Sequence, residues 1–281
     1  MQNSKVYTTS PLPFQGQKRF FLTEYKEALN QLCGKAPITT VIDLFGGSGL
    51  LAHTAKRLNP SLRVIYNDYD DFHVRLNHIP ETNRLLAELR LITADCRKLQ
   101  RLDEKVQEDI VKVIEGAAGR GFVDYITLSG SLLFSSNYAT SLAEMKRTSF
   151  YAKVRNEDYN ADGYLDGLEV VKCDYRELAA KYSGRNDVLF VLDPPYLSTD
   201  VSTYNSAKHW RLPDYLDILK LLPNNNYIYF TSNKGNLVEL LEWMAENPLR
   251  GNPLENAIKR IRRNSLNYNS GYDDIMLFRC A

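Results

Sequence analysis

The stretch Thr40-Val-Ile-Asp-Leu-Phe-Gly-Gly-Ser-Gly49 decides the fold of this 281-residue chain. Its first six residues form a short apolar run rich in β-branched side chains, which predicts a buried strand. The glycines at positions 46, 47 and 49 allow a tight turn and a close approach of the backbone to a ligand. A helix-like stretch over 50–58 and a strand-like run over 62–66 follow. Together they make a βαβ unit, which implies a parallel sheet.

The same alternation returns in the last third of the chain. Strand-like runs cover 168–173, 188–192 and 227–231, and helix-like runs cover 175–181, 213–222 and 236–246. Two further strands, over 257–262 and 274–278, are expected to form an antiparallel hairpin at one edge of the sheet. We therefore predict a Rossmann-like α/β fold with a mostly parallel sheet.

The middle of the chain, from about 81 to 166, does not continue this alternation. An amphipathic helix is expected over 99–115, whereas 129–164 is rich in Ser, Tyr, Asn and basic residues and has no clean period. A structureless loop of that length would be unusual in a compact domain. We therefore predict an inserted, mainly helical subdomain over 81–166, with 1–80 and 167–281 forming the other domain.

Composition excludes several classes of protein. The formal net charge is only +1, so any surface that binds nucleic acid must come from local clustering of basic residues. The four cysteines and four histidines have no metal-ligand spacing, which argues against a zinc site or a disulfide framework. No apolar stretch is long enough to span a membrane, and no signal-peptide core is recognisable, so we expect a cytoplasmic protein.

A second motif follows the next predicted strand. Asp68 lies 19 residues after Gly49, where an acidic side chain can accept hydrogen bonds from ribose hydroxyls. The glycine spacing matches neither a phosphate loop nor the G-x-G-x-x-G pattern of dehydrogenases. The glycine loop alone could be an ordinary strand-to-helix turn, but the loop and Asp68 together favour a cofactor that contains a nucleoside.

The third motif is Asp193-Pro-Pro-Tyr196, directly after the apolar run over 188–192. Two consecutive prolines end the strand and stiffen the turn, because each fixes its φ angle and lacks a backbone donor. The turn would hold a carboxylate, free carbonyl oxygens and an aromatic ring at the edge of the sheet where α/β folds bind ligands. The alternative is a turn without function.

These motifs in this order resemble the Dam-like class of DNA adenine-N6 methyltransferases, over most of the chain apart from the middle. The resemblance implies S-adenosylmethionine as the cofactor and double-stranded DNA as the substrate. The segment Phe14-Gln-Gly-Gln-Lys18 is similar to one that closes over the methionine end of the cofactor, and Asp174-Tyr175 to a pair that binds its adenine. The implied cofactor-binding residues are Phe14, Gln15, Gly16, Lys18, Asp43, Phe45, Gly46, Gly47, Ser48, Gly49, Asp68, Asp174 and Tyr175.

The resemblance also assigns the catalytic signature to Asp193, Pro194, Pro195 and Tyr196. The Asp193 carboxylate and the Pro194 carbonyl would accept the two amino protons of an adenine flipped out of the duplex, and Tyr196 would stack on the base. Basic and polar side chains of the insertion and of the C-terminal hairpin are candidate DNA contacts, or else an ordinary solvated surface. They are Asn137, Lys146, Arg147, Lys153, Arg155, Arg262 and Arg263.

Several alternatives stay open at this point. An RNA adenine methyltransferase is the nearest, although Asp at position 193 favours DNA, and cytosine-N4 enzymes more often carry Ser there. A non-catalytic DNA-binding protein that keeps the fold is another. The insertion carries no clear match to the Arg/Asn/Gly-rich recognition segment of GATC-reading relatives. The recognised DNA sequence, the oligomeric state and a partner restriction endonuclease are therefore open.

Overall fold

The computed structural model describes residues 5–134, 137–195, 210–233, 243, 254, 256–267 and 270–281, with the backbone alone for 264–267, 270 and 271. Tyr196 and the helix predicted over 236–246, apart from Trp243, lie outside the described residues. The chain divides into two compact units, each considered on its own. The first comprises residues 1–9, 17–70 and 164–281, and the second comprises residues 10–16 and 71–163.

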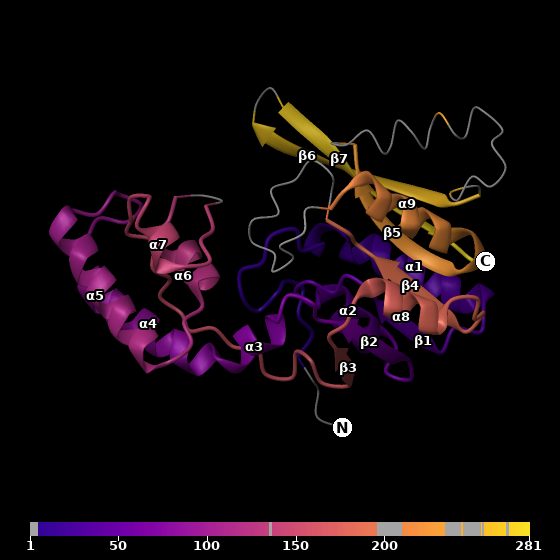
Figure 1. The fold of residues 1–281 in the computed structure, drawn as a ribbon, viewed down its shortest axis with the longest axis horizontal. Helices are drawn as coiled ribbons and strands as arrows, with labels where there is room; N and C mark the ends of the chain where they lie inside the picture. The colour runs from indigo at the N-terminus through magenta and orange to yellow at the C-terminus, as the bar shows by residue number, and fades with distance from the viewer. Residues whose placement is uncertain are drawn as a thin grey trace. The chain divides into compact units, whose positions relative to one another are not determined.

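The first unit is built on a seven-stranded sheet in the order β3-β2-β1-β4-β5-β7-β6 (Figure 1). The strands are β1 (Thr40–Asp43), β2 (Arg63–Asn67), β3 (Leu168–Val171), β4 (Val188–Leu192), β5 (Asn226–Ser232), β6 (Ile258–Asn267) and β7 (Ser270–Arg279). The first five strands in that order are parallel, and β7 runs antiparallel between β5 and β6. The predicted Rossmann-like α/β fold with a mostly parallel sheet is confirmed.

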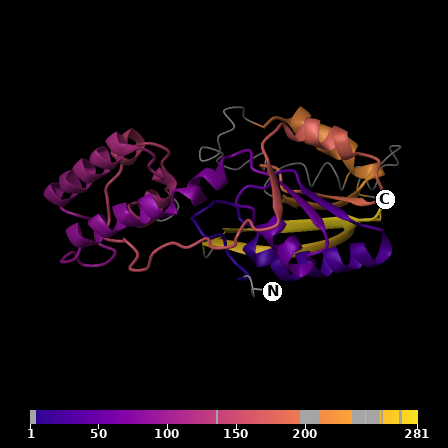
Figure 2. The ribbon, with the colours of Figure 1, turned by 90° about the horizontal axis from the view of Figure 1, so that it is seen from below.

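Helices cover both faces of this sheet (Figures 1 and 2). One face carries η1 (Arg19–Phe21), α1 (Leu22–Lys35) and α2 (Leu50–Leu58), and the other carries α8 (Tyr175–Tyr182), α9 (Leu212–Leu221) and η2 (Leu222–Asn224). Alternate strand residues serve the two faces. Phe190 belongs to the buried cluster under α8 and α9, whereas the ring of Phe230 lies 5.6 Å from that of Phe21 on the other side.

The described elements of the second unit are all helices: α3 (Phe72–Asn77), α4 (Ile79–Ile92), α5 (Glu104–Arg120), α6 (Tyr125–Leu132) and α7 (Leu142–Met145). They enclose a core of their own, which includes Leu86, Leu89, Ile110 and Ile114. The unit begins at residue 71 rather than 81, and it also takes in residues 10–16. None of the helices in the described ranges is long and apolar enough to cross a membrane.

The helix predicted over 99–115 is wrong at both ends. The structure places α5 over Glu104–Arg120, after Asp103 in an extended conformation. Leu99 has a left-handed φ of 65°, and its N–H donates to the Ala152 carbonyl at 2.9 Å. The apolar period of the sequence contains no sign of this long-range pairing.

The hairpin strands are longer than predicted, since β6 runs to Asn267 and β7 starts at Ser270. Their added residues are mostly polar, and an apolar pattern cannot reveal strands of that composition.

Candidate active site

The candidate site lies where β1 and β4 run side by side, with Asp43 paired to Val191 in the parallel register. The chain turns to opposite sides after these two strands, which makes this position the topological switch point of the sheet. The glycine loop leaves the carboxyl end of β1, and Asp193 leaves the carboxyl end of β4. The fold therefore brings together two motifs that are about 150 residues apart in the sequence.

The positions of the loop require glycine for two different reasons, backbone conformation and packing. Gly47 and Gly49 have φ values of 49° and 73°, in the left-handed region that favours glycine. Gly46 is required by packing, since a Cβ atom there would lie 2.2 Å from carbons of the Tyr66 ring. The sequence predicts that the backbone at Gly46 approaches a ligand closely, whereas the structure shows that it approaches the Tyr66 side chain of β2.

A buried ion pair joins the segment before α1 to the turn after β4 at this site. Lys18 Nζ lies 2.6 Å from Asp193 Oδ2, and the two side chains are only 9% and 16% exposed. The Lys18 ammonium also lies 5.8 Å from the centroid of the Phe230 ring. This contact orients the Asp193 carboxylate, and salt screens such a largely buried pair only weakly. The sequence resemblance predicts Lys18 near the cofactor but gives no sign of its ion pair with Asp193.

Asp43, at the end of β1, is 1% exposed, and neither carboxylate oxygen has a hydrogen-bond partner within the described part of the chain. Burial and the negative charge of Asp193 raise the pKa of Asp43 to about 7, although the nearby N–H groups of Ala52 and Phe45 and the Lys18 charge oppose the rise. Buried polar groups are nearly always paired in native proteins. A buried carboxyl whose nearby N–H groups do not reach full hydrogen-bond geometry can still accept a cationic ligand, such as S-adenosylmethionine.

Aromatic rings line the site between the glycine loop and residues 193–195. The Phe45 ring centroid lies 4.9 Å from that of Tyr175 and 5.3 Å from that of Trp210. The Trp210 centroid lies 5.4 Å from that of Tyr215, whose hydroxyl donates to the Pro195 carbonyl. Sequence reasoning missed Tyr215. The sequence signal for this residue was its place on the apolar face of the helix predicted over 213–222, which indicates burial and not a role in a site.

The two other predicted acids follow neighbouring strands. Asp68 comes directly after β2 and is fully buried. Asp174 precedes α8, and its Oδ1 atom accepts the Arg176 N–H at 2.8 Å as a helix cap. Between them Asn67, which sequence reasoning did not assign, donates from Nδ2 to the carbonyls of Leu44 and Cys173, both at 3.1 Å. Asn67 thereby ties together the carboxyl ends of β1, β2 and β3.

The predicted N-terminal segment is divided between the units. Lys18 belongs to the first unit, whereas Phe14, Gln15 and Gly16 belong to the second. There the Phe14 ring packs edge-on against Phe72, with centroids 5.6 Å apart.

Most of the candidate DNA contacts in the second unit are engaged by protein groups. Lys146 pairs with Glu115 at 2.6 Å, and Lys153 Nζ donates to the Leu133 carbonyl at 2.8 Å. The Arg155 guanidinium lies 4.1 Å from the Tyr159 ring centroid. Asn137 and Arg147 are exposed.

Of the two candidate DNA contacts on β6, one is paired with a protein group and the other is exposed. Arg262 pairs with Glu24 of α1 at 2.7 Å, whereas Arg263 is exposed. A phosphate group would have to compete with Glu24 for Arg262, so Arg263 is the more available of the two.

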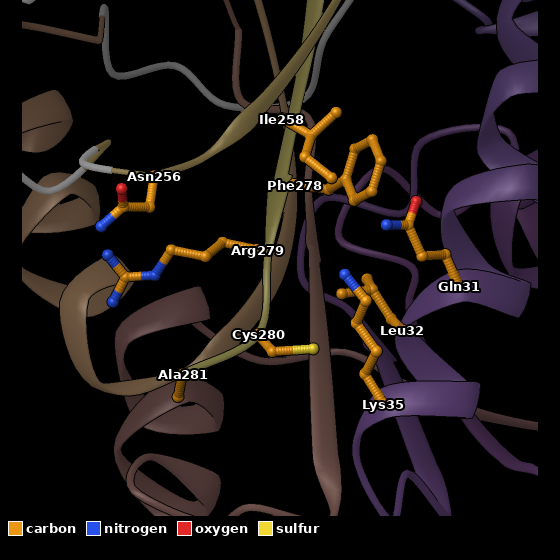
Figure 3. Close-up of a pocket in the computed structure, with 9 residues that line it drawn as sticks. All are labelled: Gln31, Leu32, Lys35, Asn256, Ile258, Phe278, Arg279, Cys280 and Ala281. Atoms are coloured by element: carbon orange, nitrogen blue, oxygen red, sulfur yellow. The ribbon is translucent and has the colours of Figure 1, made fainter.

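A hollow of about 400 Å³ lies away from this site. It is lined by α1, β6 and the end of β7, where Arg279 pairs with Tyr227 near the start of β5. Figure 3 shows Gln31 and Lys35 on one side of β7, and Asn256 and Arg279 on the other. This hollow is therefore at the opposite edge of the parallel strands from the buried acids.

Comparisons with known proteins agree with this geometry. Residues 14–220 match the family described as D12 class N6 adenine-specific DNA methyltransferase. A Haemophilus influenzae protein named "Putative methyltransferase" is 37% identical over 287 residues, covering 99% of this chain and 95% of its own length. A precorrin-6y C5,15-methyltransferase structure from Geobacter metallireducens is 7% identical with a TM-score of 0.37, covering 99% of this chain and 100% of that one, a likeness too distant to bear on the argument. The family match spans well over half of the chain, which therefore belongs to the D12 class of N6 adenine-specific DNA methyltransferases.

Proposed function

We propose that this methyltransferase moves a methyl group from S-adenosylmethionine to the N6 atom of an adenine flipped out of double-stranded DNA. The observation that carries the proposal is the buried charge cluster at the switch point. Asp193 is held there by Lys18, and Asp43 lies close enough for its charge to interact with both. Such a cluster suits a site that binds a cation next to a polarised nucleophile.

The residues of the first unit fit the parts of the cofactor. Its positively charged sulfur makes the methyl group electrophilic. The Asp43 carboxylate would offset positive charge on the bound molecule, and Asp68 would accept hydrogen bonds from the ribose hydroxyls. The rings of Phe45, Tyr175 and Trp210 would pack against the nucleoside base, and Asp174 would bind the polar edge of that base.

Asp193 and Pro194 would prepare the target nitrogen. The lone pair of an adenine amino group is delocalised into the ring, so the nitrogen is a poor nucleophile. Hydrogen bonds from its two protons to the Asp193 carboxylate and the Pro194 carbonyl would favour a tetrahedral nitrogen with its lone pair aimed at the methyl group. One amino proton must leave after transfer, and the Asp193 carboxylate would take it. Lys18 keeps that carboxylate oriented.

We further propose that the second unit, predicted as an insertion over 81–166, reads the DNA target. Its separate helical core supplies a rigid platform, and its exposed Asn137 and Arg147 can reach a phosphate or a base edge. Unpairing and flipping the base costs a few kcal/mol, which phosphate contacts would offset.

The test is transfer of a labelled methyl group. Purified protein is incubated with methyl-labelled S-adenosylmethionine and either unmethylated genomic DNA or RNA, and the nucleosides are then separated. We expect label in N6-methyldeoxyadenosine. Label in RNA alone would replace DNA by RNA as the substrate, and no binding of the cofactor would overturn the cofactor assignment.

A matched pair of variants tests the role of Asp193. Asp193→Asn should abolish transfer while cofactor binding persists. Asp187→Asn makes the same chemical change at the other end of the strand, where Asp187 pairs with Arg185 in solvent, and should leave transfer unchanged. Near-normal turnover by Asp193→Asn would refute the catalytic assignment.

A further inference from the structure

Two consecutive carbonyls of the glycine loop are each held by a buried tyrosine. Tyr66 donates its hydroxyl to the Gly47 carbonyl at 2.7 Å, and Tyr164 donates its hydroxyl to the Ser48 carbonyl at 2.9 Å. Both tyrosines are at most 1% exposed. Because a peptide unit is planar, fixing each carbonyl also fixes the N–H on the opposite side of the same unit. The two hydroxyls therefore set the direction in which the loop presents its backbone.

Tyr164 reaches the loop from far along the chain. It lies 116 residues after Ser48, at the point where the chain re-enters the first unit from the second. Gly163 just before it has a φ of 70°, a turn that favours glycine. The loop conformation thus depends on a residue that none of the cofactor motifs contains.

His53, in the first turn of α2, contacts both the ring and the backbone carbonyl of Tyr164. The two rings stack with centroids 4.8 Å apart and an interplanar angle of 18°, and His53 Nδ1 lies 2.7 Å from the Tyr164 carbonyl. His53 Nε2 accepts the Tyr7 N–H at 3.0 Å. Since Nε2 is an acceptor, the proton of the neutral ring resides on Nδ1, which donates to Tyr164.

We propose that Tyr164 is a positioning residue of the methyl-transfer site, with His53 as its support. Its hydroxyl holds the Ser48 carbonyl, and with it the glycine loop, in the conformation that binds the cofactor. This inference rests on the proposed binding of S-adenosylmethionine at the loop. Neither residue touches the reacting atoms, so the first effect of losing the contact falls on cofactor affinity.

The test is a titration of S-adenosylmethionine by calorimetry, with wild type, Tyr164→Phe and Tyr182→Phe. Tyr164→Phe removes only the hydroxyl and leaves the Ser48 carbonyl buried without its donor, so we expect cofactor affinity to fall about five- to fiftyfold. Tyr182 is also buried but lies on α8, across the sheet. Tyr182→Phe should bind the cofactor as wild type does, and urea unfolding of both variants separates a loss of stability from a loss of affinity.

The support by His53 is tested by a double-mutant cycle. His53→Ala should weaken cofactor binding in the wild-type background and have a clearly smaller effect in the Tyr164→Phe background, because the contact it supports is already absent. Equal binding by Tyr164→Phe and wild type would overturn the inference, as would additive effects of the two changes. Failure of wild type itself to bind would instead overturn the proposed function, so the two failures are distinguishable.

Discussion

Replacing Asp43 by Asn should make the folded protein more stable at neutral and alkaline pH. The carboxyl group is buried and its pKa is raised to about 7, whereas its pKa in the unfolded chain is about 3.9. Ionisation therefore costs more in the folded protein than in the unfolded chain. Asn keeps the shape of the side chain and removes the charge.

The magnitude follows from the two pKa values. Each unit of pKa corresponds to about 1.4 kcal/mol, so ionising Asp43 in the folded protein costs about 4 kcal/mol more than in the unfolded chain. The folded state binds the extra proton, so wild type loses this stability as the pH rises from about 4 to about 7. The Asn variant has no such loss. The difference between the two proteins should grow over that range and stay constant above it.

Urea unfolding from pH 5 to pH 8 measures this difference directly. Groups that titrate alike in both proteins cancel, and so does any constant cost of fitting the Asn amide into the site. We expect the variant to gain about 2 to 3 kcal/mol relative to wild type between pH 5 and pH 8. A stability difference that does not change with pH would show that Asp43 ionises without cost in the fold, and the reasoning would fail.

The same substitution should weaken cofactor binding. In the proposed complex the ionised carboxylate offsets positive charge on S-adenosylmethionine, so its affinity should fall as the pH drops below about 7. The Asp43→Asn variant should bind more weakly at pH 8 and show a flatter pH profile. Asp43 would then be a residue whose charge costs stability and supports function.

Three further outcomes are expected. Tyr215→Phe removes the hydroxyl that holds the Pro195 carbonyl, so kcat should fall about tenfold while the KM for the cofactor changes little; an unchanged kcat would contradict this role. Asp124→Ala removes the carboxylate paired with the 9% exposed Arg75 guanidinium at 2.9 Å. This leaves a buried charge with only neutral acceptors and should cost about 3 to 5 kcal/mol in urea unfolding; a loss below about 1 kcal/mol would count against it. Burial lowers the pKa of His53, so nitrogen-15 NMR should find the neutral Nδ1–H ring taking up its second proton at a lower pH than a solvent-exposed histidine does. Folding stability should fall as the pH drops below about 6.5, where the unfolded chain already binds that proton; a ring that becomes charged at or above that pH would refute the assignment.

The glycine loop and the turn that begins at Asp193 could be predicted because their signals are local. The apolar run over 188–192 and the run before Gly46 show the continuous hydrophobicity of strands that are buried on both faces. The prolines after Asp193 and the glycines after Phe45 then mark where each strand ends. A parallel sheet places such ends at one edge, so their proximity follows from the fold class alone.

The supports of the site could not be predicted, since they join residues with no local relation. Lys18 and Asp193 are 175 positions apart, and a lone lysine gives no sign of its partner. Tyr164 lies in a segment without hydrophobic period, where one tyrosine among several carries no signal. The pKa of Asp43 depends on burial by α1 and α2 and on the charge of Asp193, which only the folded arrangement determines.

The second unit is built from two stretches of chain that are separated in the sequence. Its residues 10–16 precede the first strand, and its remaining residues 71–163 follow the second strand. The Pro13 carbonyl accepts a hydrogen bond from Arg75 at 2.9 Å, so the short piece completes the polar interior of the long one. A fragment limited to 71–163 would lack this hydrogen bond, and a swap of the second unit between relatives would have to exchange both pieces. A single crossover within the gene would separate them.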